Sequence, residues 1–285
     1  MAAIQEIKSR ITSVKSTSKI TKAMQMVSAS RMQLAQQRAI AAEPYAQNIH
    51  KLVTKLAGQA EATNPYLIKR AEIRNIAIIV VGTNRGFVGS LLSALTLEAH
   101  KLVEDLKEQY PQANIHGISI HKTGLKVLAH AQIPGNYHFA EAFENVNTTD
   151  LTAVFKLVET KYLEEEFDKV FIVYTHFVNT LLQQAKHIEL LPVTVAESLT
   201  VTENPFIYEP GLEEVLERLL EEYVQSQIYT SILEGLASEH SARMIAMKNA
   251  TDNAQELEQQ LNLSYNRQRQ AEITQQLIEV INGAG

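Results

Sequence analysis

A glycine-containing segment near the middle of the chain is the first candidate for chemistry. Gly82, Gly86 and Gly89 follow an apolar run at 76–81 and precede a helical pattern, which is where phosphate-binding loops lie in nucleotide-binding proteins. Their G-x3-G-x2-G spacing matches neither the dinucleotide fingerprint nor the P-loop, and no Lys-Ser or Lys-Thr pair follows. The spacing therefore favours a tight strand-to-helix turn, with a nucleotide-binding α/β regulator as an alternative.

Other residue types offer little catalytic apparatus. The chain has no Cys, which excludes disulfides, thiolate metal sites and Cys nucleophiles. Nine His are scattered; His116 and His121 flank one strand-like run, but no HExxH motif accompanies them. The run of glutamates at 164–166 is typical of a solvated helix end, and no GxSxG elbow is present. The sequence therefore predicts no catalytic, metal or cofactor site.

Composition narrows the class of protein further. The chain carries 26 Lys and Arg against 32 Asp and Glu, a net charge of −6, which argues against wholesale nucleic-acid binding. It lacks both a signal-peptide pattern and an apolar run of roughly 18 residues that a membrane span needs. We therefore expect a soluble or peripheral protein. Only 11 Gly and 7 Pro occur, which indicates long uninterrupted elements.

The two ends of the chain read as long helices. The first spans about 3–57, with apolar residues at coiled-coil spacing at positions 4, 7, 11 and 14. Pro44 should bend it and Gly58 should end it. The second runs from Leu212 to about Ile281. At 1.5 Å per residue they would span roughly 80 and 105 Å, so each must protrude or pair.

The middle of the chain changes period. Strand-like runs lie at 76–81, 115–120 and 169–177, with one more within 179–195, and helical patterns lie at 86–108, 122–131 and 148–167. This alternation predicts a Rossmann-like α/β domain with a mostly parallel sheet. The expected organisation is thus an N-terminal helix at 1–60, an α/β domain at 70–205 and a C-terminal helix at 210–285.

Charge and polarity suggest how the terminal helices are used. Residues 1–60 hold nine Lys and Arg against two Glu, a surplus of seven, whereas residues 209–239 hold eight Glu against Arg218 alone. Opposite charges at opposite chain ends favour an antiparallel coiled coil. The basic helix has one aromatic residue, Tyr45, which favours an acidic protein partner over nucleic acid or a membrane surface.

The far part of the last helix has an unusual composition. Residues 238–276 are rich in small and polar residues, and the end, 278–285, becomes apolar again. This composition fits a helix that a partner surrounds without binding it permanently. The apolar end suggests that a partner encloses it like a sleeve. The alternative is a long exposed coiled coil with a frayed end, in a structural coiled-coil adaptor with an α/β head.

Both termini resemble one family. Residues 11–32, ITSVKSTSKITKAMQMVSASRM, closely resemble the N-terminal signature of F-type ATP synthase γ subunits of bacterial type. Residues 238–254 and 263–277 are similar to its C-terminal signature, and Pro44-Tyr45 and Tyr208-Glu-Pro210 also fit. These segments cover about a fifth of the chain. At 82–90 the chain reads GTNRGFVGS where the family often has SDRGLCGG, and no redox insert interrupts the middle.

This resemblance implies the central-stalk rotor of a rotary ATP synthase. It implies a non-catalytic subunit without cofactor, one copy per complex, that carries torque between an ion-driven membrane ring and catalytic sites on β subunits. The implied partners are the α3β3 hexamer, the ε subunit and the c-ring, and the implied location is peripheral, on the cytoplasmic face of the cell membrane.

The resemblance also implies two sets of contact residues. The expected contacts with β are Lys19, Lys22, Met24, Arg243, Arg269 and Gln270. The expected contacts of the foot with the ring and ε are Phe206, Tyr208 and Glu209.

Overall fold

The computed structural model describes residues 2–57, 64–139, 148–194 and 208–283. The chain divides into two compact units, one made of residues 1–30 and 243–285 and the other of residues 31–242. Each unit contains part of both terminal helices.

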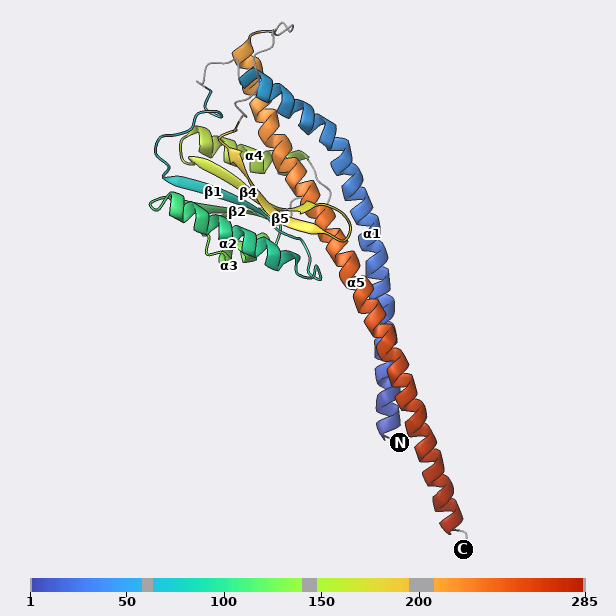
Figure 1. Cartoon of the computed structure of the whole chain (residues 1–285). Coiled ribbons are helices and arrows are strands. Elements are labelled where there is room, and N and C mark those ends of the chain that lie inside the picture. Colours follow the sequence, from blue (N-terminus) through green and yellow to red (C-terminus); the bar gives the residue numbers. More distant parts are fainter. Residues whose placement is uncertain (1, 58–63, 140–147, 195–207, 284–285) are drawn as a thin grey trace. The chain divides into compact units, whose positions relative to one another are not determined.

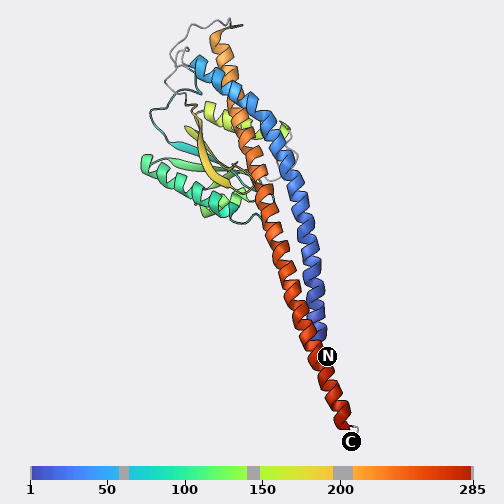
Figure 2. The ribbon, with the colours of Figure 1, turned by 45° about the vertical axis from the view of Figure 1, so that its right-hand side comes forward.

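The terminal helices are uninterrupted. Helix α1 (Ala2–Ala57) has 56 residues and helix α5 (Leu212–Gly283) has 72. Helix α1 continues through Pro44, and its second half is curved in both views (Figures 1 and 2). A proline removes one backbone hydrogen bond and its ring crowds the preceding turn, which accounts for such a curve. The expected helix stop, Gly58, lies outside the described residues.

The larger unit is built on a five-stranded sheet with the order β3-β2-β1-β4-β5 (Figure 1). Strands β1 (Asn75–Val81), β2 (Asn114–Ile120), β3 (Gly135–Phe139) and β4 (Lys169–Phe177) are parallel, and β5 (Gln183–Leu191) is antiparallel to β4. This order places the switch point of the doubly wound sheet at β1, so the loop after β1 occupies the usual ligand position of such folds.

Helices cover both faces of the sheet. Helices α2 (Leu91–Gln109) and α3 (Gly124–His130) pack on one face, and α4 (Thr148–Leu163) packs on the other with the second half of α1 and the first half of α5. Strand β1 shows why both faces are apolar. Ile76, Ile78 and Val80 enter the core under α2, whereas Ile79 and Val81 enter the core shared with α1 and α5. A strand buried on both sides needs this continuous apolar run.

The structure confirms the expected fold class, with some local differences. Strand β3 was not expected because its sequence, GNYHF, carries little apolar character. The final strand begins at Gln183, after a tight turn. Helix α2 begins at Leu91 rather than 86, because 82–90 form a loop, and α4 ends at Leu163 rather than 167. Among the described helices, none has the length and apolarity needed to cross a bilayer.

Candidate functional sites: the distal helix pair and the loops that hold the domain

The smaller unit is an antiparallel pair formed by the first part of α1 and the last part of α5, which lie side by side in both views (Figure 2). Thr21 and Thr251 meet across the pair with a 2.7 Å distance between their hydroxyl oxygens, and both are buried. Ser28 and Met247 are buried in the same seam. Around Thr21 the seam is thus made mainly of small and polar groups, whereas nearer the start of α1 the half-buried Ile4, Ile7, Ile11 and Val14 line it.

The outer surface of this pair is charged and partly apolar. Lys19 and Lys22 are exposed, and Met24 close to them is half-buried. Ile20, Met26 and Val27 are exposed in the same turns of α1. An ion pair between Lys15 and Glu258, with a 3.9 Å separation, is the weak, solvated kind that contributes at most about 1 kcal/mol.

The structure does not bring the six expected β-contact residues into one site. Thr21 lies opposite Thr251 and Lys15 lies opposite Glu258, so the pairing runs antiparallel and places Lys22 near the level of residue 250. Gln270 is therefore about 30 Å further along the axis, at 1.5 Å per residue. Arg269 and Gln270 are exposed, whereas Arg243 is only 5% exposed. The expected contacts therefore lie at two levels along the helix axis, with Lys22 at one and Gln270 at the other. Arg243 is a buried residue of α5.

The end of α5 has no neighbour from α1 among the described residues. The last half-buried residue of α5 is Glu272, and every residue from Ile273 to Asn282 is exposed. This agrees with the antiparallel pairing, because the first residues of α1 lie beside α5 at about the level of Glu272. The exposed end carries several large apolar side chains: Ile273, Leu277, Ile278, Val280 and Ile281.

The loop after β1 is occupied by the protein's own groups. The Asn84 N–H donates to the carboxylate of Glu239 at 3.0 Å, and Glu239, on α5, is 1% exposed. The Thr83 N–H donates to the Thr123 hydroxyl at 2.6 Å. A Cβ on Gly82 would lie 2.4 Å from the Gly124 nitrogen. The backbone N–H groups of Thr83 and Asn84 are therefore already bonded within the protein, and the close approach of Gly82 to Gly124 agrees with the tight turn that the spacing favours.

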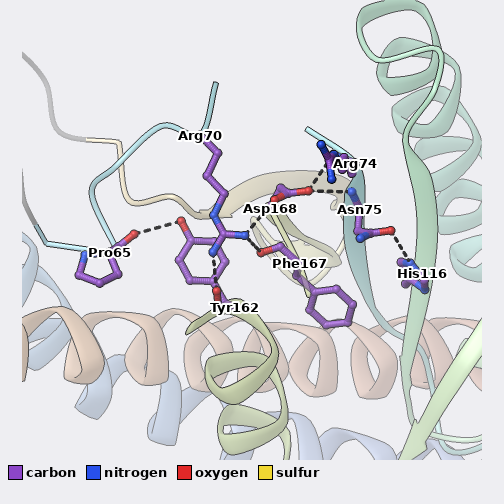
Figure 3. Close-up of polar contacts among 8 residues, drawn as sticks. All are labelled: Pro65, Arg70, Arg74, Asn75, His116, Tyr162, Phe167 and Asp168. Atoms are coloured by element: carbon purple, nitrogen blue, oxygen red, sulfur yellow. Dashed lines mark hydrogen bonds and ion pairs between the residues drawn. The ribbon is translucent and has the colours of Figure 1, made fainter. Parts of the chain in front are cut away.

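A polar cluster joins the segment before β1 to α4 and β4 (Figure 3). Arg70 donates to Asp168 at 2.8 Å, and Asp168 also accepts the N–H groups of Arg74 and Asn75 at 2.7 and 2.8 Å. Burial raises the pKa of the Asp168 carboxyl, but the hydrogen bonds from Arg70, Asn75 and Arg74 outweigh it and hold that pKa below its usual value. The carboxylate therefore stays charged at neutral pH.

The histidines take structural positions. The His116 ring lies 3.3 Å from the Asn75 side-chain oxygen, and the His121 ring nitrogen lies 3.1 Å from the Gly82 carbonyl. Within the part of the chain that the structure describes, no group of three or more His, Asp or Glu side chains is arranged to hold a metal.

The expected foot residues are only partly described. Phe206 lies outside the described residues. Tyr208 is half-buried against the core that α1 and α5 share with the sheet, and Glu209 is exposed. Of the two, Glu209 therefore has the side chain that is open to a partner.

The residues that sequence reasoning missed are polar, and all are buried except Arg70, which is half-buried. Thr21, Thr251 and Glu239 lie within the family-like segments but have no distinctive type, and Arg70 and Asp168 lie almost a hundred residues apart. The sequence marks each of them only as a polar residue at a position that helical periodicity, or the neighbouring strand, predicts to be buried.

The comparisons with known proteins bear on these features. A family model described as ATP synthase matches residues 3–285. The chain is 39% identical to the ATP synthase gamma chain of Geotalea daltonii and 37% identical to that of Roseiflexus castenholzii, covering 100% of this chain and 98% of each relative. The chain belongs to the ATP synthase γ family. It is therefore a central-stalk subunit of an F-type ATP synthase and is not catalytic, since ATP is made or hydrolysed on β subunits.

Solved structures agree with this membership of the γ family. The central stalk and ring of the Tetrahymena thermophila mitochondrial ATP synthase includes a chain with 25% identity and a TM-score of 0.57, covering 81% of this chain and 99% of that one. A rotor chain of the Euglena gracilis mitochondrial ATP synthase has a TM-score of 0.66 at 17% identity, covering 95% and 99%. The second likeness shows the fold alone.

Proposed function

We propose that this γ-family chain carries torque between an ion-driven ring in the membrane and the catalytic sites of a ring of three α and three β subunits. The observation that carries the proposal is the smaller unit, in which the pair of helices gives way to a single helix end with exposed large apolar side chains. Exposed apolar side chains on a helix end mark a surface that a partner covers. A sleeve formed by the hexamer fits this end.

The contact with β centres on the first part of α1. Lys19, Lys22 and Met24 lie in the same turns as the exposed apolar residues Ile20 and Val27. Exposed apolar side chains flanked by Lys suit an acidic partner surface, and solvated ion pairs of about 0–1 kcal/mol each allow contacts to be exchanged during rotation. Arg269 and Gln270 serve a second level of contact, nearer the end of α5.

Arg243 has a different place in the proposal. Because its side chain is 5% exposed, a partner reaches it only if the helix surface rearranges. We therefore assign the direct contacts to the other five residues, which are exposed or, in the case of Met24, half-buried, and give Arg243 a supporting position within α5.

The α/β domain takes the second role in the proposal. We assign 70–205 to the foot domain and assign contacts with the ring and the ε subunit to Phe206, Tyr208 and Glu209. Exposed Glu209 supports this assignment. In the assembled enzyme the chain is peripheral to the cell membrane, on its cytoplasmic face, with one copy per complex.

Reconstitution tests the proposal. The chain is co-expressed with the α and β subunits of a bacterial ATP synthase, and the purified complex is assayed for ATP hydrolysis. A stable complex whose activity depends on this chain is expected. Absence of a complex, or activity that is equal without the chain, would contradict the proposal.

A cross-link tests the contact with β. The chain has no native Cys, so Met24→Cys is the sole thiol of the variant. With a single Cys placed in turn along the facing β loop, oxidation should give a γ–β product and stop turnover, which reduction restores. Glu272→Cys, on the last half-buried turn of α5, serves as a thiol at another level. A Met24→Cys variant that cross-links at none of the β positions would remove that contact from the proposal.

A further inference from the structure

The larger unit has a gap in its packing where the second half of α1 faces α5. The buried residues Ala35, Ile49 and Leu56 of α1 fall on one seven-residue step, the repeat with which a paired helix presents its seam. The same step includes Ala42, which is only half-buried, and every residue from 36 to 48 is half-buried or exposed. The seam therefore lacks a buried side chain at position 42, in the curved half of the helix (Figures 1 and 2).

The space at this position is a groove of about 450 Å³. Ala42 and Ala46 of α1, Leu151 of α4 and Tyr229 of α5 line it. Small-molecule sites in proteins have volumes of about 300–1,000 Å³ and mostly apolar walls with a few polar groups. In volume and in lining, the groove therefore falls within the range of such sites.

The two charged residues among the described lining of the groove are Glu222 and Arg38. The Tyr45 hydroxyl donates to the Glu222 carboxylate at 3.0 Å, and the Arg218 guanidinium donates to it at 3.3 Å. Arg38 precedes Tyr45 by seven residues, so it lies roughly 10 Å along α1 from this paired carboxylate. No described residue forms a hydrogen bond or an ion pair with the Arg38 guanidinium. One end of the groove thus carries an unpaired cation.

Thr230 lines the groove at the same end as Arg38. It follows Glu222 by eight residues on α5, and α5 runs antiparallel to α1. The Thr230 hydroxyl oxygen is buried without a hydrogen-bond partner, which is rare for a buried polar atom. Threonine in a helix populates two rotamers, so rotation about one bond turns this hydroxyl toward a bound group. A guanidinium and a hydroxyl are both donors to a carboxylate.

We propose that this groove binds a small amphipathic carboxylate, with its charged group at Arg38 and its apolar body against Ala42 and Ala46. The bound molecule takes the place of the missing seam side chain and stabilises the pairing of α1 with α5 in the larger unit, because it binds only the folded chain. This binding is separate from the torque-carrying role and needs only the chain's own residues.

The test uses 2-naphthoate as the probe and 2-naphthamide, which has a similar shape but no charge, as its counterpart. The full chain, with ¹³C-labelled alanine methyl groups, is titrated with each compound and followed by NMR, since Ala42 and Ala46 line the groove. Arg38→Gln removes the cation and Ala42→Phe fills the groove. Arg31→Gln, which changes an exposed arginine of the same helix, is the matched control.

The expected result is a saturable shift of the Ala42 and Ala46 methyl signals. The wild type should bind naphthoate at least about tenfold more tightly than naphthamide, because a hydrogen bond to a charged group contributes that much. Arg38→Gln should bind the two compounds equally, whereas Arg31→Gln should keep the preference. Ala42→Phe should bind neither compound. Naphthoate should raise the thermal transition of the wild type and leave that of Ala42→Phe unchanged.

Two results would overturn the carboxylate site: equal affinity of the wild type for both compounds, or a preference for naphthoate that survives Arg38→Gln. Should Ala42→Phe not fold, the comparison of Arg38→Gln with Arg31→Gln decides, because neither arginine is buried. Equilibrium dialysis then measures naphthoate binding by the purified complex of this chain with α and β subunits. Binding with the affinity of the isolated chain is expected. A complex that binds no naphthoate would show that a neighbouring subunit covers the groove, and would overturn the site in the assembled enzyme.

Discussion

Asp168 carries a charge in a largely buried position because three donors surround it. Removing that charge leaves the Arg70 guanidinium without its carboxylate, and breaking a buried pair from one side typically costs about 3–5 kcal/mol. Asp168→Asn should therefore lower the free energy of unfolding by about 3 kcal/mol, measured by urea denaturation. Glu72→Gln, which opens an exposed pair nearby, should leave it unchanged. An Asp168→Asn variant as stable as the control would contradict the role of the charge.

The same carboxyl sets a pH dependence. Its pKa in the folded chain is lowered below 3.8, so the unfolded chain takes up the proton first as pH falls. The stability that Asp168 contributes is complete above about pH 5 and is lost as pH falls from about 4 through the lowered pKa. The difference in unfolding free energy between the wild type and Asp168→Asn should shrink in that acidic range. A difference that grows towards low pH would have the wrong sign.

The threonine pair gives a prediction within the smaller unit. The Thr251 hydroxyl also lies 2.8 Å from the Met247 carbonyl, and the Thr21 hydroxyl lies 3.1 Å from the Ser18 carbonyl, so while one threonine donates across the pair the other can donate inside its own helix. Thr21→Val should cost about 1 kcal/mol, because Thr251 loses a hydrogen-bond partner at a buried position. The double change to Val should cost less than the sum, since two apolar groups then face each other.

Native-state hydrogen exchange of the amides around Thr251 measures this double-mutant cycle. Ser16→Ala, on the exposed side of α1, is the control and should not alter exchange. Strictly additive effects of the two Val substitutions would show that the hydroxyls do not interact.

At the scale of elements, the loop between β1 and α2 is fixed by a close backbone approach. A Cβ at Gly82 would lie within 2.8 Å of two Gly124 backbone atoms, whereas a Cβ at Gly86 would have nothing within 4 Å. Gly82→Ala should therefore shift the loop away from α3 and destabilise the larger unit by about 1–3 kcal/mol, as overpacking does. Gly86→Ala should be close to neutral. Thermal unfolding of both variants provides the comparison, and equal transition temperatures would contradict the close approach.

The helices and central strands could be predicted because their burial repeats with a clear period. In β1, all residues after Asn75 are buried, and the first part of α1 shows half-buried and buried residues at alternating three- and four-residue steps. Strand β3 could not be predicted, because it is an edge strand whose residues are mostly exposed or half-buried. The antiparallel direction of β5 depends on the turn at Asn179, whose side chain accepts two backbone N–H groups.

The candidate sites were less predictable than the elements. The motif resemblance predicts residue types on α1 and α5 but not whether their side chains are buried. Arg243 is therefore predicted at a contact surface, whereas it is buried in the structure. Contacts such as Asn84 with Glu239 join residues 155 positions apart, and no local pattern encodes such a pairing. A single sequence shows which residues are polar, whereas the three-dimensional fold decides which of them meet.

At the scale of the whole molecule, the exposed end of α5 separates what folding requires from what assembly requires. None of the described side chains from Ile273 to Asn282 is buried, so removing residues 273–285 should leave the thermal stability of the chain unchanged. Association with the hexamer should suffer, because a fully buried large aliphatic side chain contributes about 1.5–3 kcal/mol. With five such side chains removed, we expect the truncated chain to dissociate from the α3β3 complex at least about tenfold faster.

Two variants distinguish side-chain contact from helix length. Replacing Ile278 and Ile281 by Ser keeps the length of the helix and removes two of its exposed apolar side chains, so part of the faster dissociation should remain. Replacing Gln275 and Gln276 by Ser changes exposed polar residues of the same helix end and should leave the rate unchanged. Dissociation rates are measured by exchange of labelled chain from the purified complex. If the truncated chain dissociates as slowly as the wild type, the hexamer does not enclose this end. The hexamer must then bind the rotor entirely through the paired part of α1 and α5.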